Sequence, residues 1–159
     1  MHSRHDPAPP PILLDSWISH YVRVDRSIPF SGRTNMYVDG REVGRVPCLA
    51  IGHAFRDGEV RLFHCGRSWA VRGNSPHATV SAAKAQAQRL YPGIGGGWLR
   101  TGLTLRAARA QRTEHWKHLA CSFCGALPPD IEQTFESRGV TICDGCVRTF
   151  AAHIAPRNP

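Results

Sequence analysis

The sequence predicts an α+β protein: a small antiparallel sheet with a covering helix, followed by a linker helix and a cysteine-rich segment. Three observations support this class. Three segments rich in β-branched and aromatic residues come first, with Asp-Gly turn dipeptides between them. An alanine-rich helical segment follows, and two Cys-x-x-Cys pairs lie near the end of the chain. Strands followed by a helix are typical of a layered domain in which the helix covers one face of the sheet.

The first predicted elements are strands that follow a proline-rich start. Clustered prolines block regular structure, so we expect residues 1–15 to form a disordered or loosely docked tail. Strand-like patterns occur at residues 17–24, 42–51 and 59–71. The dipeptide Asp57-Gly58 separates the last two segments, which should therefore form a hairpin that closes there.

The next predicted element is a helix from Val80 to Leu90. Thr79 is suited to cap its N-terminus, and several alanines give the segment strong helix propensity. Apolar residues recur along one side and would pack on the sheet. Pro92-Gly93 should end the helix, so residues 16–92 are predicted to form one small α+β domain.

A linker is predicted over residues 93–118. It begins with residues 93–97, of which four are glycine, and we expect this segment to be a flexible hinge. A second helix is expected from Thr104 to Leu119, with arginines at every third position of its first turns. This basic helix leads directly into the cysteine-rich segment.

Four cysteines form the most specific motif of the chain. Cys121 and Cys124 make one Cys-x-x-Cys pair, Cys143 and Cys146 make the other, and eighteen residues separate the pairs. Two tight turns at this spacing can place four thiolates around one ion, which predicts a structural Zn²⁺ site. The alternatives are redox motifs or buried free thiols. Zinc held by four cysteines has no open coordination position and would not activate water.

The residues around these cysteines resemble the N-terminal zinc-binding domain of the bacterial unfoldase ClpX. The similarity covers Leu119 to Ala155, with the same loop length between the pairs and apolar residues at the hairpin positions. The chain departs from the family at Gly145, where an acidic residue is usual, and at Pro128-Pro129. The resemblance implies a treble-clef zinc finger over residues 119–155 that dimerises and docks adaptor proteins or substrates. It does not imply an ATPase, because the chain has no phosphate-binding loop.

Apolar residues near the cysteines could form either a minimal core or a contact surface. In related fingers, part of the equivalent surface forms the dimer contact. The candidate partner-binding residues are Phe123, Ile131, Phe135, Val147 and Phe150. Their spacing leaves both interpretations open.

The charge distribution suggests an anionic partner. The net charge is +8, and no acidic residue lies between Val60 and Thr113, where nine arginines or lysines occur. Such a pattern favours contact with nucleic acid or another polyanion, with an aromatic ring stacking on a base. The candidate residues are Arg61, Arg67, Trp69, Arg72, Arg106, Arg109 and Arg112. The alternative is that Trp69 packs in the core and the arginines are only solvated.

Other chemistry is weakly supported by the sequence. Cys65 could pair with a histidine as a nucleophile, but no acid pair or glycine-framed serine accompanies it, so we expect no enzyme. Cys48, Cys65, His53 and His64 could be imagined as a second metal site, yet His64 and Cys65 are adjacent in a strand and should point to opposite faces.

The expected function is a non-enzymatic interaction module. Its zinc finger would mediate dimerisation or docking to a protein partner, as an adaptor or regulator, and the alternative is a nucleic-acid-binding protein with a structural zinc finger. The chain lacks an apolar signal core and a run of apolar residues long enough to cross a membrane. Six cysteines without an export signal favour a cytoplasmic location with metal-bound thiolates.

Overall fold

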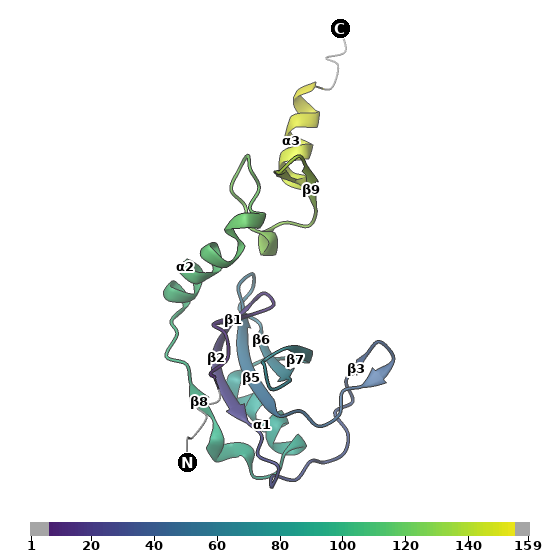
Figure 1. Cartoon of the computed structure of the whole chain (residues 1–159), viewed down its shortest axis with the longest axis vertical. Coiled ribbons are helices and arrows are strands. Elements are labelled where there is room, and N and C mark those ends of the chain that lie inside the picture. Colours follow the sequence, from purple (N-terminus) through teal and green to yellow (C-terminus); the bar gives the residue numbers. More distant parts are fainter. Residues whose placement is uncertain (1–6, 155–159) are drawn as a thin grey trace. The chain divides into compact units, whose positions relative to one another are not determined.

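The computed structural model describes residues 7–154, except for the side chain of Pro129, and it confirms the predicted α+β class. The chain divides into two compact units, Met1–Ala108 and Arg109–Pro159 (Figure 1). The N-terminal unit contains the main sheet and its covering helix, and the C-terminal unit contains the cysteine motif.

The main sheet of the N-terminal unit is antiparallel throughout. Its central order is β1-β2-β5-β6-β7, and β8 also pairs with β2. The strands are β1 (Ile12–Leu13), β2 (Ser16–Arg23), β5 (Cys48–Ala54), β6 (Val60–Cys65), β7 (Val71–His77) and β8 (Leu99–Arg100). Since neighbouring strands are mostly consecutive in the chain, short turns can join them.

The hairpin predicted around Asp57-Gly58 is present between β5 and β6. His53 lies opposite Val60 in the register, and the Ala54 N–H donates to the Glu59 carbonyl at 2.9 Å. The predicted strand at residues 59–71, however, is two strands. It breaks after Cys65 at a turn, and β7 continues beyond its expected end.

The predicted disordered tail requires a correction within the described residues. Residues 1–6 lie outside them, but Ile12 and Leu13 form β1 and pair with Trp17 and Ser16. The carbonyl of Pro7 accepts a hydrogen bond from the Trp69 indole at 2.9 Å. Backbone pairing with β2 and burial of the two apolar side chains of β1 therefore stabilise a strand here, although several prolines precede it.

Both faces of the sheet are buried. Helix α1 (Val80–Leu90) covers one face, and the Thr79 hydroxyl caps it by accepting from the Ala82 N–H at 3.1 Å, as predicted from the sequence. The opposite face carries a second apolar cluster, composed of Leu13, Ile18, Cys48, Ala50, Phe63, Cys65 and Trp69. A sheet covered on both sides gives the unit a rigid centre.

The predicted glycine hinge is also corrected. Residues Ile94–Gly97 form a short 3₁₀ helix, η1, and Ile94 is only 1% exposed. The Gly95 N–H donates to the Gln88 side chain at 3.0 Å, and a Cβ on Gly97 would lie 3.0 Å from Val22. The segment is therefore a regular turn that contacts α1 through Gly95 and β2 through Gly97, and not the irregular connector that its composition predicts.

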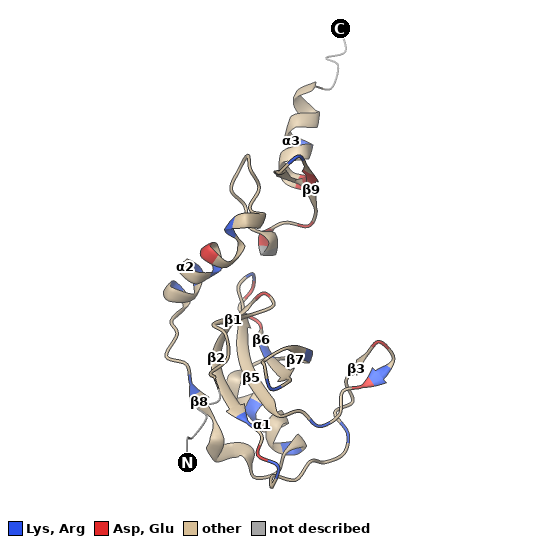
Figure 2. Ribbon diagram, viewed as in Figure 1, with Lys and Arg blue, Asp and Glu red and all other residues tan. Residues whose placement is uncertain are grey.

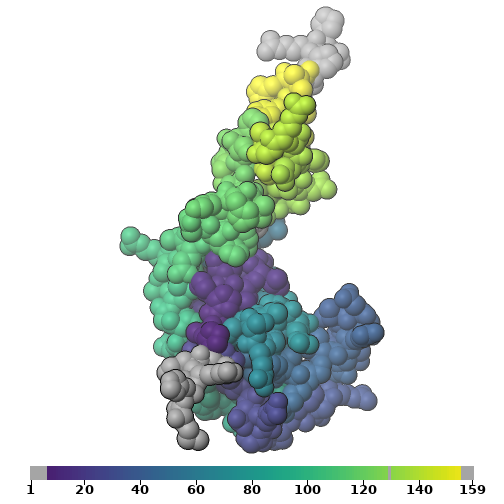
Figure 3. Space-filling view, in the orientation of Figure 1, coloured from purple at the N-terminus to yellow at the C-terminus, as the bar shows by residue number. Residues whose placement is uncertain are grey.

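A two-stranded ribbon extends from the N-terminal unit. It consists of β3 (Tyr37–Val38) and β4 (Arg41–Glu42), and it projects beyond the main sheet (Figure 1, Figure 3). Tyr37 is 66% exposed at this position. The ribbon is therefore outside the core.

The C-terminal unit contains a hairpin and a helix after the first cysteine pair. Helix α2 (Leu105–Trp116) runs from one unit into the other, and two 3₁₀ turns follow, η2 (Lys117–Leu119) and η3 (Pro128–Asp130). The remaining elements are β9 (Thr134–Ser137), β10 (Val140–Cys143) and α3 (Asp144–Ile154). A turn, a hairpin and a helix in this order form a treble-clef arrangement.

No helix among the described residues combines the length and the apolar character needed to cross a membrane.

Candidate metal centre

The structure brings the four predicted ligand cysteines together. Cys121 and Cys124 lie in the turn after η2, Cys143 is the last residue of β10, and Cys146 is in the first turn of α3. All four sulfur atoms lie within 4.8 Å of one another. The Cys121–Cys146 and Cys124–Cys143 sulfurs are 3.8 Å and 3.7 Å apart. A tetrahedral ion with metal–sulfur bonds of about 2.3 Å has sulfur–sulfur distances of about 3.8 Å.

Backbone hydrogen bonds shape the turn that holds the first pair. The Gly125 N–H donates to the Cys121 carbonyl, and the Cys121 N–H donates to the Ala126 carbonyl, both at 2.9 Å. Gly125 has a φ of 74°, a conformation that glycine adopts without steric cost. The Ser122 N–H also donates to the Thr141 carbonyl at 2.7 Å, so the turn is attached directly to β10.

The hairpin places the second pair. Its turn residues Arg138 and Gly139 both have positive φ angles, 51° and 78°, as a type I′ turn requires. The resulting register puts Cys143 opposite Thr134 at the open end of the hairpin, where α3 begins. The helix start then brings Cys146 back toward the first turn.

Backbone amides donate to the sulfurs. The Cys143 N–H lies 3.4 Å from the Cys121 sulfur, and the Cys146 N–H lies 3.4 Å from the Cys143 sulfur. Hydrogen bonds from Cys124 above all, and from Cys143, lower the pKa of the Cys121 thiol to about 6. Desolvation, together with the neighbouring sulfurs, raises the pKa of Cys146 to about 12. A bound cation relieves the repulsion among four thiolates, so the group is suited to hold one metal ion.

The apolar residues around the cysteines remain largely exposed. The exposed fractions are 57% for Phe123, 49% for Phe135, 37% for Val147 and 45% for Phe150, and Ile131 is half-buried. The Phe123 and Phe150 rings meet edge to face, with centroids 5.4 Å apart. These side chains are thus exposed to solvent rather than enclosed in a core.

Cys48, Cys65, His53 and His64 do not form a second metal site. Cys48 and Cys65 lie opposite each other on β5 and β6 in the second apolar cluster. His64 is on the α1 side of the sheet, where it lines a cavity with Gln86 and Leu90. Within residues 7–154, the only group of three or more possible ligands is the four-cysteine cluster.

The candidate nucleic-acid residues do not all lie on an accessible surface. Trp69 is 3% exposed and its ring packs edge to face on Tyr21, so it cannot stack on a base. Arg61 forms ion pairs with Asp15 at 2.8 Å and Glu59 at 2.9 Å. The side chain of Arg112 is mostly buried and pairs with Asp130. The exposed candidates are Arg67, Arg72, Arg106 and Arg109. Figure 2 shows that basic positions of the N-terminal unit are spread over several elements.

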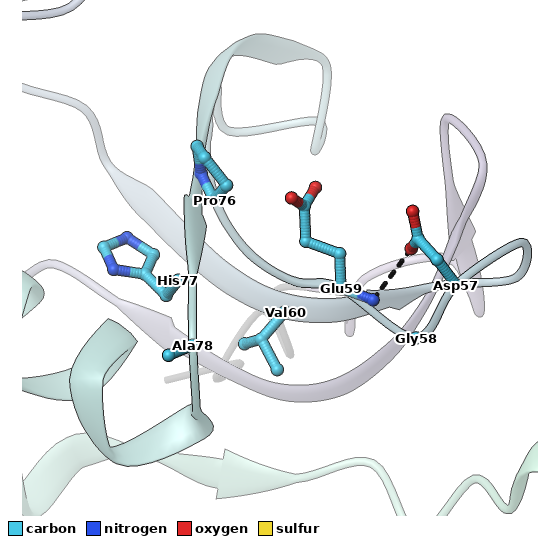
Figure 4. A pocket seen from close by; sticks show the side chains of 7 residues that line it. All are labelled: Asp57, Gly58, Glu59, Val60, Pro76, His77 and Ala78. Atoms are coloured by element: carbon cyan, nitrogen blue, oxygen red, sulfur yellow. Dashed lines mark hydrogen bonds between the residues drawn. The ribbon is translucent and has the colours of Figure 1, made fainter.

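An open depression beside the β5–β6 turn does not assemble reactive groups. It is lined by Asp57, Glu59, Pro76 and His77 (Figure 4). The Asp57 carboxylate accepts from the Glu59 N–H at 2.9 Å, and the Glu59 carboxylate is paired with Arg61. The His77 ring instead meets the Ser75 hydroxyl at 2.9 Å. The Asp57 carboxylate is thus engaged in the turn, and the Glu59 carboxylate is engaged in the ion pair with Arg61.

One group of polar side chains comes together without a signal in the sequence. Ser19, His20 and His53 meet at the edge of the α1-covered face, within hydrogen-bonding distance. Regular alternation would place Ser19 and His20 on opposite faces of β2, so the strand pattern gave no signal of this group.

No protein-family model matches the sequence, and no similar curated protein or solved structure was found.

Proposed function

We propose that the protein is a non-enzymatic interaction module whose C-terminal unit is a ClpX-type finger built on one structural Zn²⁺ ion. Soft thiolate ligands in a tetrahedral arrangement favour zinc over the hard cations Mg²⁺ and Ca²⁺. Four protein ligands leave no position for a substrate, which supports a structural role. Retention of four thiolates fits a reducing compartment such as the cytoplasm.

One observation carries the interaction role: the apolar surface of Phe123, Phe135, Val147 and Phe150 beside the cysteines. Val147 and Phe150 are three residues apart in α3, so they share one side of the helix. Exposed apolar groups gathered on one small folded unit are typical of interaction sites. We propose that a second copy of the chain covers this surface, with docking of another protein as the alternative.

The metal is tested by elemental analysis of the purified chain. We expect one zinc per chain, loss of zinc in Cys143→Ser, and retention in Cys65→Ala, which removes a buried thiol outside the cluster. Chelation should abolish amide protection in β9 and β10 and leave protection in β5 and β6 intact, because the metal supplies much of the folding energy of a unit this small. Full protection in β9 and β10 after chelation would refute the structural zinc.

Dimerisation is tested by sedimentation equilibrium of the zinc-loaded chain. We expect a reversible dimer that Phe150→Ala weakens at least tenfold, since truncating a central aromatic contact costs more than about 1 kcal/mol. Tyr37→Ala is the control, because Tyr37 is also an exposed aromatic residue, at 66% against 45% for Phe150, and it lies on the β3–β4 ribbon. A zinc-loaded chain that is monomeric at millimolar concentration would exclude the dimer.

Nucleic-acid binding is the second candidate, favoured by the nine basic residues between Val60 and Thr113 without an acidic one. Arg67 lies in the β6–β7 turn, Arg72 lies at the start of β7, and both are exposed. If they contact phosphates, the double variant Arg67→Gln/Arg72→Gln should weaken binding to an oligonucleotide and reduce its salt dependence by about two units of slope. Binding that does not change with salt would exclude this function.

A further inference from the structure

A β-bulge interrupts the regular pairing of β2 with β5. Ile18 lies opposite Gly52, but His20 lies opposite Ile51, so Ser19 is an extra residue on the β2 side. A bulge redirects the side chains next to it, and bulges are frequent beside functional sites. Here the redirection brings Ser19 and His20 to the α1 side of the sheet, toward His53.

Three polar side chains meet at the bulge. The Ser19 hydroxyl oxygen lies 2.9 Å from His20 Nδ1 and 3.0 Å from His53 Nε2, and it also donates to the Ile51 carbonyl at 3.2 Å. Because the hydroxyl has one proton, given to Ile51, both imidazoles must donate to its oxygen. Each neutral ring then keeps one unprotonated nitrogen, and His20 donates to an anion only after that nitrogen takes up a proton.

This group lines a cavity of about 500 Å³. Its size falls in the range that small-molecule ligands occupy. None of the described residues that line it is acidic, and Arg100 from β8 lies at its edge, opposite His20 in the β2–β8 register. No described residue forms an ion pair with Arg100, which is exposed. Its guanidinium is therefore available to an anion.

The positive charge of Arg100 also affects the protonation of His20. Desolvation lowers the pKa of His20, and the positive charges of Lys84 and Arg100 lower it further, together with His53. Lys84, from α1, has its ammonium 5.8 Å from the centre of the Trp98 ring. An anion bound beside Arg100 would offset part of this repulsion of a protonated imidazole.

The rest of the cavity wall is apolar and contains a flat surface. The Trp17 ring stacks on the His53 ring with centroids 4.6 Å apart and an interplanar angle of 19°. Val80 and Leu103 also line the cavity. An apolar wall with aromatic rings accepts a planar ring of a ligand.

We propose that this pocket binds a small anion that carries a planar ring, of the nucleoside monophosphate class. The phosphate would lie against Arg100 and His20, and the ring against the wall formed by Trp17, Val80 and Leu103. This site lies in the N-terminal unit and does not depend on the proposed zinc finger.

Calorimetric titration of the full zinc-loaded chain with adenosine monophosphate, adenosine and inorganic phosphate tests the proposal. We expect the monophosphate to bind at least tenfold more tightly than either of the other two. Arg100→Gln should weaken monophosphate binding at least tenfold and leave adenosine binding unchanged. Arg106→Gln removes the same charge from an exposed position on α2 and should have little effect.

Nuclear magnetic resonance then locates the ligand. The monophosphate should shift the imidazole signals of His20 and His53, and Ser19→Ala should reduce the affinity because both rings lose their common partner. The proposal is overturned if the monophosphate does not bind at millimolar concentration. It is also overturned if Arg106→Gln weakens binding as much as Arg100→Gln does, or if the two histidine signals do not move.

Discussion

Replacement of His64 by glutamine should make the N-terminal unit less sensitive to acid. His64 lies in β6, is 1% exposed, and its Nδ1 has no hydrogen-bond partner among the described residues. Burial, and to a smaller extent the charge of the nearby His77, lowers the pKa of His64 from 6.5 to about 4. Between these two pKa values His64 is neutral in the folded chain and protonated in the unfolded chain. The free energy of unfolding therefore falls as the pH decreases from 6.5 toward 4.

The size of the effect follows from this shift. One pKa unit corresponds to about 1.4 kcal/mol, so His64 should remove about 2 kcal/mol of stability by pH 5 and about 3 kcal/mol by pH 4, relative to pH 7.5. Glutamine is neutral throughout this range. The variant should therefore lose less stability on acidification by these amounts, whatever its stability at pH 7.5.

Urea unfolding at pH 7.5 and pH 5, followed through the amide signals of β5 and β6, measures this difference. Signals from these strands report the sheet alone, so acid release of metal from the cysteines does not enter the result. If the wild type and His64→Gln lose stability in parallel between the two pH values, the assigned role of His64 is wrong.

Three further substitutions test the packing. Tyr91→Phe removes the hydroxyl that accepts from the buried Val46 N–H at 2.9 Å, and urea unfolding should show a loss of about 1–3 kcal/mol. Gly52→Ala would place a Cβ 2.9 Å from the Phe63 ring, and the same assay should show a loss of about 1–3 kcal/mol; an unchanged midpoint would contradict the close approach. Gly139→Ala should destabilise the folded C-terminal unit by about 1 kcal/mol, because alanine is strained at the φ of 78° that Gly139 adopts. A chelator competition should therefore show a zinc affinity that is roughly fivefold weaker.

Local signals in the sequence predicted much of the fold. The Asp57-Gly58 dipeptide located the β5–β6 hairpin, and Thr79 marked the start of α1. The spacing of the cysteines predicted their convergence, because the required geometry resides in two short turns and one hairpin. Such features depend on residues close together in the chain.

Features that depend on distant contacts were not predictable. The glycines at 95–97 signal flexibility by composition, but their packing is determined by Gln88 and Val22 elsewhere in the unit. The bulge at Ser19 similarly arises from pairing with β5, more than thirty residues away. A charge pattern also could not reveal that Trp69 is buried.

The six cysteines fall into two groups, and the reactivity of each group reports on a different unit of the chain. Cys48 and Cys65 are sealed inside the sheet, whereas the other four cysteines share the cluster. An alkylating reagent should modify the cluster thiols once the metal is withdrawn, and the two sheet thiols only when the sheet opens. Counting labelled sulfurs by mass would thus follow the unfolding of each unit separately, without any introduced probe.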